Sequence, residues 1–165
     1  MKTVFIALGG NLGNVEEAFR SARSDIKALP GTSVSSSSLL YRTPPVGPQD
    51  QPDYHNALIS IQTDLAPIPL LDALQAIENR YGRIRKEHWG ARTLDLDIIA
   101  IESDIIHSPR LTVPHAFMFE RQFVLRPLCD LAPNWQHPRL GETAAIRLEK
   151  LIATGETALS EGETW

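Results

Sequence analysis

The stretch TLDLDIIAI (residues 93–101) combines strand-forming apolar residues with two aspartates that stand two positions apart. Side chains of a β-strand point alternately to its two faces. The two leucines and Ile98 therefore share one face, while Asp95 and Asp97 share the other. The pattern predicts a core strand that carries both carboxylates on the same side.

The segments upstream of this strand predict a mixed order of strands and helices. Asn14 can cap the first helix, because Glu17 follows it three positions later, and a Pro-Gly pair ends that helix. The expected elements are a strand at 3–8, a helix at 15–29, strands at 32–42 and 56–63, a helix at 69–82 and the strand at 93–101. This order is the ferredoxin-like βαββαβ unit, an α+β fold in which helices pack on an antiparallel sheet.

The rest of the chain adds shorter elements to this unit. The sequence predicts a hairpin around residues 102–104, a short helix near 119–125 and a helix at 143–152 as C-terminal additions. The last ten residues are small and acidic, which predicts a loosely held end. A length of 165 residues fits one domain that spans residues 1–165.

The composition is that of a globular protein, with 42% hydrophobic and 22% charged residues. A net charge of -4 argues against a surface for nucleic acid or anionic membrane, since both need an excess of Lys and Arg. The chain has no apolar run near the roughly 18 residues of a spanning helix and no signal-peptide cleavage pattern. Its single cysteine, Cys129, cannot form an internal disulfide. We therefore expect a cytoplasmic monomer with no nucleic-acid or membrane partner.

The aspartate pair predicts a metal site. Two ionised carboxylates on one face repel each other unless a cation compensates them, and Mg²⁺ binds few carboxylates while keeping water and substrate phosphates. Just upstream, Arg83, Arg85 and Arg92 surround Trp89, and guanidinium groups are suited to phosphate. Carboxylates for a metal beside arginines for phosphate indicate a nucleoside triphosphate site. The plainer alternative is an edge strand with solvated aspartates.

A second basic group follows in RLTVPHAFMFER (residues 110–121). Arg110, His115 and Arg121 are spaced to reach one ligand from a loop and a helix start. Each alone could be a surface or structural residue, and only their combination favours ligand binding.

Two loops carry further information. The proline-rich segment TPPVGPQDQPDY (residues 43–54) predicts a long, shaped loop, and such loops in compact domains are often functional. The segment GGNLG (residues 9–13) matches neither glycine-rich phosphate motif. We interpret it as a tight turn between the first strand and the first helix.

Three segments occur in an order and at separations that resemble one enzyme family. They are YRTPPVGPQDQPDYHNA (residues 41–57), GRIRKEHWGARTLDLDI (residues 82–98) and RLTVPH (residues 110–115). Together they resemble the 6-hydroxymethyl-7,8-dihydropterin pyrophosphokinases, and the similarity extends over nearly the whole chain. The resemblance implies an enzyme of folate biosynthesis that moves a diphosphate from ATP to a pterin alcohol, with two Mg²⁺ ions and in-line attack on the β-phosphorus.

The resemblance also implies roles for individual residues. Asp95 and Asp97 would bind both Mg²⁺ ions, and Arg83 and Arg92 would act in catalysis. The pterin would stack between the rings of Tyr54 and Phe123, in a pocket formed by Thr43, Pro44, Val46, Tyr54, Asn56, Trp89 and Phe123. The nucleotide and its phosphates would contact Gln75, Glu78, Arg85, Trp89, Ile98, Arg110, Thr112, His115 and Arg121.

Two other functions are compatible with parts of the pattern. The βαββαβ order is also that of RNA-recognition modules, whose central strands display stacking aromatic residues. The strand at 56–63 has no aromatic residue, which argues against that function. A two-metal nucleotidyltransferase would use the same aspartates but release diphosphate instead of AMP. The proline-rich loop with Tyr54 and Asn56 favours a small planar acceptor.

Overall fold

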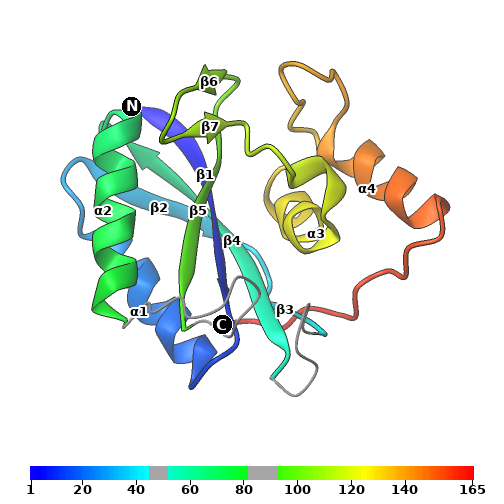
Figure 1. The fold of residues 1–165 in the computed structure, drawn as a ribbon, viewed down its shortest axis with the longest axis horizontal. Coiled ribbons are helices and arrows are strands. Elements are labelled where there is room, and N and C mark those ends of the chain that lie inside the picture. The colour runs from blue at the N-terminus through cyan, green and yellow to red at the C-terminus, as the bar shows by residue number, and fades with distance from the viewer. Residues whose placement is uncertain (45–51, 82–92) are drawn as a thin grey trace.

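A computed structural model describes residues 1–44, 52–81 and 93–165 and shows a central antiparallel sheet between two layers of helices (Figure 1). The sheet order is β2-β4-β1-β5, and β3 also pairs with β4. The strands are β1 (Lys2–Gly10), β2 (Thr32–Ser37), β3 (Tyr41–Thr43), β4 (Tyr54–Thr63) and β5 (Asp95–Ile101). The ferredoxin-like α+β fold expected from the sequence is confirmed.

The strand predicted at 32–42 is divided into β2 and β3, which lie along the same edge of β4. Residues 38–40 separate the two pieces, and Ser38 begins this break. Its hydroxyl accepts a hydrogen bond from the Leu58 N–H at 2.8 Å and donates to the Leu39 carbonyl at 2.7 Å. A side chain thus takes the place of a backbone carbonyl in the ladder, so the strand is interrupted while the edge stays paired.

Helices α1 (Val15–Lys27) and α2 (Pro67–Arg80) cover one face of the sheet, and α3 (Gln122–Leu131) and α4 (Ala144–Ala153) lie on the other side (Figure 1). Asn14 caps α1 as predicted, because its side chain accepts a hydrogen bond from the Glu17 N–H at 3.1 Å. Each layer has its own apolar core, and the sheet lies between them. None of the helices in these described ranges is both long and apolar enough to cross a bilayer.

The two faces of β5 are as the sequence predicts. Leu96 and Ile98 are buried in the core under α1 and α2, whereas Ile99 belongs to the core on the α3 side. The register between β1 and β5 shifts next to Phe5, so that Ala100 joins Ile99 on the α3 side. Asp95 and Asp97 precede this irregularity and keep strict alternation.

The hairpin that follows β5 lies further along the chain than predicted. Residues 102–104 form a turn, but the paired strands are β6 (Ile106–His107) and β7 (Thr112–Val113), which enclose residues 108–111. Ser108 closes this loop, because its backbone N–H donates to the Leu111 carbonyl at 3.0 Å. The short helix predicted near 119–125 is a 3₁₀ turn, η1 (Met118–Glu120), followed by the longer α3. The helix predicted at 143–152 is α4.

The end of the chain is held more firmly than its composition indicates. Leu40 and Glu163 exchange backbone hydrogen bonds of 2.7 and 2.9 Å. The indole N–H of Trp165 donates to the Ser38 carbonyl at 2.7 Å, and its ring lies under the Arg23 guanidinium at 4.0 Å. These contacts hold the last residues beside β3. A large aromatic ring packs there, and the backbone pairs with the side of the short strand segment that β4 leaves unpaired.

Tyr41 links β3 to α3 inside the molecule. Its side chain is 0% exposed, and its hydroxyl donates to an Asp130 oxygen at 2.6 Å. The same carboxylate accepts the Leu39 N–H at 3.1 Å and pairs with Arg126 at 3.1 Å. Burial, and then the bond to Asp130, raise the pKa of Tyr41 above its ordinary value.

Removing the hydroxyl in Tyr41→Phe should lower the free energy of unfolding by about 1–2 kcal/mol, because a buried bond to a charged acceptor is lost. The melting temperature should fall by about 2–8 °C in calorimetry. Tyr81→Phe is the matched control, since that hydroxyl lies 3.4 Å from its acceptor on Asp25 and should matter less. Equal stability of Tyr41→Phe and the unmodified chain would contradict the role assigned to this bond.

Candidate active site

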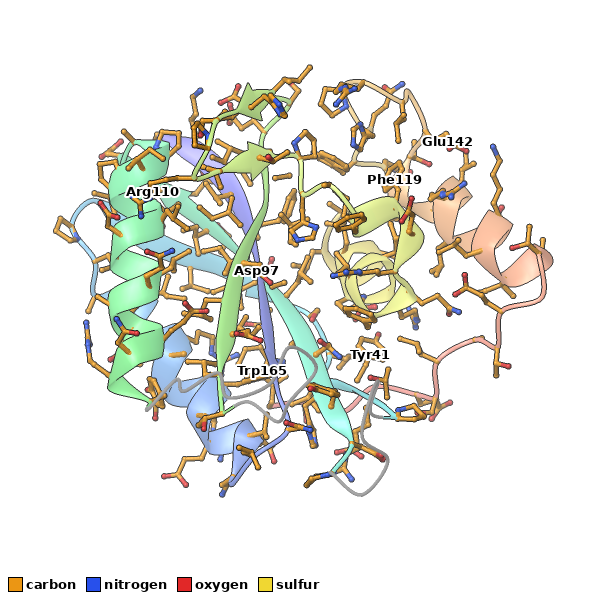
Figure 2. The ribbon with its side chains drawn as sticks, in the orientation of Figure 1. Tyr41, Asp97, Arg110, Phe119, Glu142 and Trp165 are labelled. Carbon is orange, nitrogen blue, oxygen red and sulfur yellow. The ribbon has the colours of Figure 1, made fainter. Side chains whose placement is uncertain are left out.

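The two aspartates of β5 project over an open part of the sheet on the α3 side. Asp95 lies opposite Gly9 of β1, and Asp97 lies opposite Ala7. Small residues at these paired positions leave the space above β1 empty of side chains. Both aspartates line one cavity, and Figure 2 shows Asp97 on β5 between the α2 and α3 layers.

This first cavity brings together residues from distant parts of the chain. Its walls are the last residue of β3 with the proline that follows it, the start of β4, the carboxylates of β5 and the start of α3. The predicted site residues that line it are Thr43, Pro44, Tyr54, Asn56, Asp95, Asp97, His115, Arg121 and Phe123. All of the described residues that the sequence analysis assigned to a pterin pocket are among them.

A second cavity lies between β5, α2 and the β6–β7 hairpin. Gln75, Glu78, Ile98, Arg110 and Thr112 line it, together with Asp97 and His115. Those last two side chains also line the first cavity, so the two cavities meet at Asp97 and His115. Arg121 was expected with the nucleotide group, but it lines the first cavity.

The end of β1 forms part of the floor of the first cavity. Gly9 and Gly10 were interpreted as a tight turn, but they are the last residues of β1 and line the cavity. Gly9 pairs with Asn56 on one side and with Asp95 on the other. Asn11 follows, and its amide donates to the Pro52 carbonyl at 3.0 Å. The segment therefore shapes the site and positions the chain that enters β4.

A side chain at Gly9 should disturb the amide beside it. A β-carbon placed there would lie 3.3 Å from the Asn56 Oδ1, which is close enough to push that amide aside. Gly9→Ala should therefore raise the Michaelis constant of a pterin substrate about 5–30-fold and leave that of ATP unchanged, as overpacking of about 1–2 kcal/mol would. Leu140→Ala is the remote control, because Leu140 is exposed and lines neither cavity. Equal effects on both substrates would show that the disturbance is not local.

His115 is fixed by its own backbone and by its neighbour. Its N–H donates to the Ile99 carbonyl at 2.8 Å, and its Nδ1 accepts the Phe117 N–H at 3.2 Å. Burial lowers the pKa of His115 below its ordinary value, Asp97 opposes that shift, and Arg121 adds to it. Because Nδ1 accepts a hydrogen bond, the neutral form of the ring carries its proton on Nε2, where it can donate to a ligand.

The second cavity has two internally paired side chains. Glu78 is 3% exposed, and its carboxylate accepts the Leu96 N–H at 2.7 Å, which holds β5 between its two aspartates. Arg110 pairs with Asp72 at 2.7 Å and reaches the Gln75 side-chain oxygen at 3.2 Å. Its position beside α2 is visible in Figure 2. The nucleotide contacts assigned to these residues stay predictions.

Part of the predicted site lies outside the described residues. Val46 belongs to the segment 45–51, and Arg83, Arg85, Trp89 and Arg92 belong to the segment 82–92.

The two carboxylates of β5 can be compared with the ligands that a metal ion requires. Among residues 1–44, 52–81 and 93–165, no three His, Cys, Asp or Glu side chains gather to hold a metal. Two carboxylates fit Mg²⁺, which takes its other ligands from water and phosphate.

Several lining residues were not predicted. Ala7 and Gly9 could have been found from the alternation of β1, because both share the face that pairs with the aspartates. Leu71 and Leu111 line the second cavity but carry no polar group that marks them in the sequence. Phe117 also lines that cavity, and its neighbours become apparent only in the folded chain.

Comparison with known proteins identifies the family of this chain. Residues 5–133 match the family model described as 7,8-dihydro-6-hydroxymethylpterin-pyrophosphokinase (HPPK). The chain belongs to that family. It is accordingly an ATP-dependent pyrophosphokinase of folate biosynthesis.

Three relatives illustrate the range of similarity. The 2-amino-4-hydroxy-6-hydroxymethyldihydropteridine pyrophosphokinase of Haemophilus influenzae is 48% identical over 134 residues, which is 81% of this chain and 84% of that protein. The enzyme of the same name from Pseudomonas aeruginosa is 46% identical, covering 84% and 85% of the two chains. The folic acid synthesis protein fol1 of Schizosaccharomyces pombe is 38% identical over 93% of this chain, but the match spans only 21% of that protein.

The fold is similar to solved structures. The wild-type HPPK-DHPS of Plasmodium falciparum superimposes with a TM-score of 0.74 at 14% identity and covers 92% of this chain. This chain spans 45% of that one, so the likeness concerns the fold of one part of it.

Proposed function

We propose that the first cavity binds 6-hydroxymethyl-7,8-dihydropterin, that the second binds ATP, and that diphosphate transfer takes place where they meet. The observation that supports this proposal is the shared wall formed by Asp97 and His115. A diphosphate group can pass between two ligands only if the acceptor oxygen and the β-phosphorus come within contact distance.

The first cavity suits a flat heteroaromatic ring. Tyr54 and Phe123 supply aromatic faces on which such a ring stacks, a contact worth about 1–3 kcal/mol by analogy with nucleic-acid bases. Asn56 offers both a donor and an acceptor to the polar edge of the ring. Thr43 and Pro44 close the side next to β3.

The second cavity suits a nucleotide whose phosphates point toward β5. Gln75 and Thr112 offer polar groups along its length, and Ile98 and Leu111 offer apolar surface. At the junction, the Nε2–H of His115 can donate to a phosphate oxygen. Arg121 brings a permanent positive charge to the same region. We assign Arg83, Arg85, Arg92 and Trp89 to the nucleotide side on the basis of the family resemblance.

Asp95 and Asp97 would hold two Mg²⁺ ions at this junction. Such ions, when bound, neutralise phosphate charge and make a coordinated hydroxyl more acidic. The pterin hydroxymethyl oxygen attacks the β-phosphorus, the bond from that phosphorus to the α-bridging oxygen breaks, and AMP leaves. A carboxylate oxygen of Asp97 is the candidate acceptor for the hydroxyl proton, because Asp97 reaches both cavities.

Identification of the nucleotide product tests this proposal. The chain is mixed with ATP, Mg²⁺ and the pterin alcohol, and AMP is expected in a one-to-one ratio with pterin diphosphate. Release of inorganic diphosphate with a nucleotidylated product would instead indicate a two-metal nucleotidyltransferase. Omission of the pterin alcohol should abolish AMP formation. We also expect the protein to be cytoplasmic and monomeric. Light scattering of the purified chain measures its molar mass and so checks the oligomeric state.

A further inference from the structure

Phe117 lies next to the His115 ring and the Arg121 guanidinium, where the two cavities meet. It precedes η1, its ring is 51% exposed, and it lines the second cavity beside His115. Its ring meets the His115 ring edge-on, with 6.3 Å between centroids. Its backbone N–H is the donor that holds Nδ1 of His115.

The ring of Phe117 also faces Arg121. The central guanidinium carbon of Arg121 lies 5.1 Å from the Phe117 ring centroid and 5.6 Å from that of Phe123. Both distances are within the range of cation–π attraction. The guanidinium therefore contacts one ring that lines the second cavity and one ring that lines the first.

We infer that Phe117 is a positioning residue for phosphate binding, which acts by holding the Arg121 guanidinium at the junction. Arg side chains have many rotamers, and a group that is already oriented loses less freedom when a ligand binds. Contact with the half-exposed Phe117 ring and with Phe123 restricts the Arg121 side chain before ATP binds. The identity of the ligand rests on the function proposed above.

The experiment measures binding of an ATP analogue with a methylene bridge between the α- and β-phosphorus, in the presence of Mg²⁺, by calorimetry. Phe117→Ala and Phe117→Leu should each raise the dissociation constant about two- to fivefold, which is the range for an exposed cation–π contact. Phe117→Tyr keeps a ring and should bind as the unmodified chain does. Leu140→Ala is the matched control, because Leu140 is 60% exposed and lines neither cavity.

A second set of variants tests whether the ring acts through Arg121. In an Arg121→Ala background, Phe117→Ala should cause no further loss of affinity. An equal loss in both backgrounds would overturn the inference, because the ring would then contact the ligand directly. Unchanged affinity of Phe117→Leu, or a clear fall in the melting temperature of Phe117→Ala, would also overturn it. Diphosphate transfer is assayed in parallel. If the unmodified chain forms AMP but the Phe117 variants bind the ATP analogue as it does, this inference alone fails. If the unmodified chain forms no AMP, the proposed function fails.

Discussion

Asp97→Asn should lower the rate of diphosphate transfer at least about 1,000-fold, which corresponds to about 4 kcal/mol of transition-state stabilisation. Asparagine keeps the shape of the side chain but loses the charge that would hold Mg²⁺ and the oxygen that would accept a proton. The position also lies on the wall of both cavities, so one change affects both ligands. The rate is measured as AMP released from ATP in the presence of the pterin alcohol.

The same substitution should leave the fold intact. Asp97 is an exposed side chain at the cavity, and asparagine keeps its shape, so no core packing is lost. The melting temperature without Mg²⁺ should therefore be close to that of the unmodified chain. Glu149→Gln provides the control for loss of one acidic charge on an exposed face of α4. Near-normal turnover by Asp97→Asn would refute the assignment of this carboxylate to the reaction.

Asn56→Ala should reduce the specificity constant for the pterin about 5- to 150-fold, the range expected when buried polar groups of a ligand lose their partners at 1–3 kcal/mol. Asn56 occupies β4 between Gly9 and Tyr41, with no bulky side chain on the Gly9 side. The loss should appear in the pterin constant, because Asn56 lines only the first cavity.

Binding of the ATP analogue separates this effect from general damage. Its dissociation constant should be the same for Asn56→Ala and the unmodified chain. Gln62→Ala is the matched control on the same strand, since Gln62 lies at the far end of β4 and bonds to Thr3 at 2.6 Å. Parallel losses for both ligands would mean that the substitution distorts the sheet, and the assignment of Asn56 to the pterin would then fail.

The parts of this fold that follow from local rules were predictable. Alternation along residues 93–101 placed both aspartates on one face, because strand geometry alone decides that outcome. The cap at Asn14 depends on residues three positions apart and was equally accessible. Family resemblance then indicated which side chains would gather, and the described ones line one of the two cavities.

The features that depend on contacts between distant segments were not predictable. The break between β2 and β3 requires the Leu58 N–H to meet the Ser38 hydroxyl across the sheet. The firm hold on the last residues depends on Arg23 and Ser38, which lie far away in the sequence. The family resemblance assigned Arg121 to the nucleotide and its phosphates, whereas its contact with two aromatic rings depends on how η1 and α3 meet the sheet.

The docking of Trp165 has a consequence for the first cavity. Its carbonyl oxygen accepts a hydrogen bond from Arg23 at 3.2 Å, and its ring packs edge-on against Phe19 at 5.8 Å. Loss of these contacts would loosen the segment that pairs with Leu40, three residues before Thr43 on the wall of the first cavity. A side chain on one side of the sheet would thereby influence a cavity on the other.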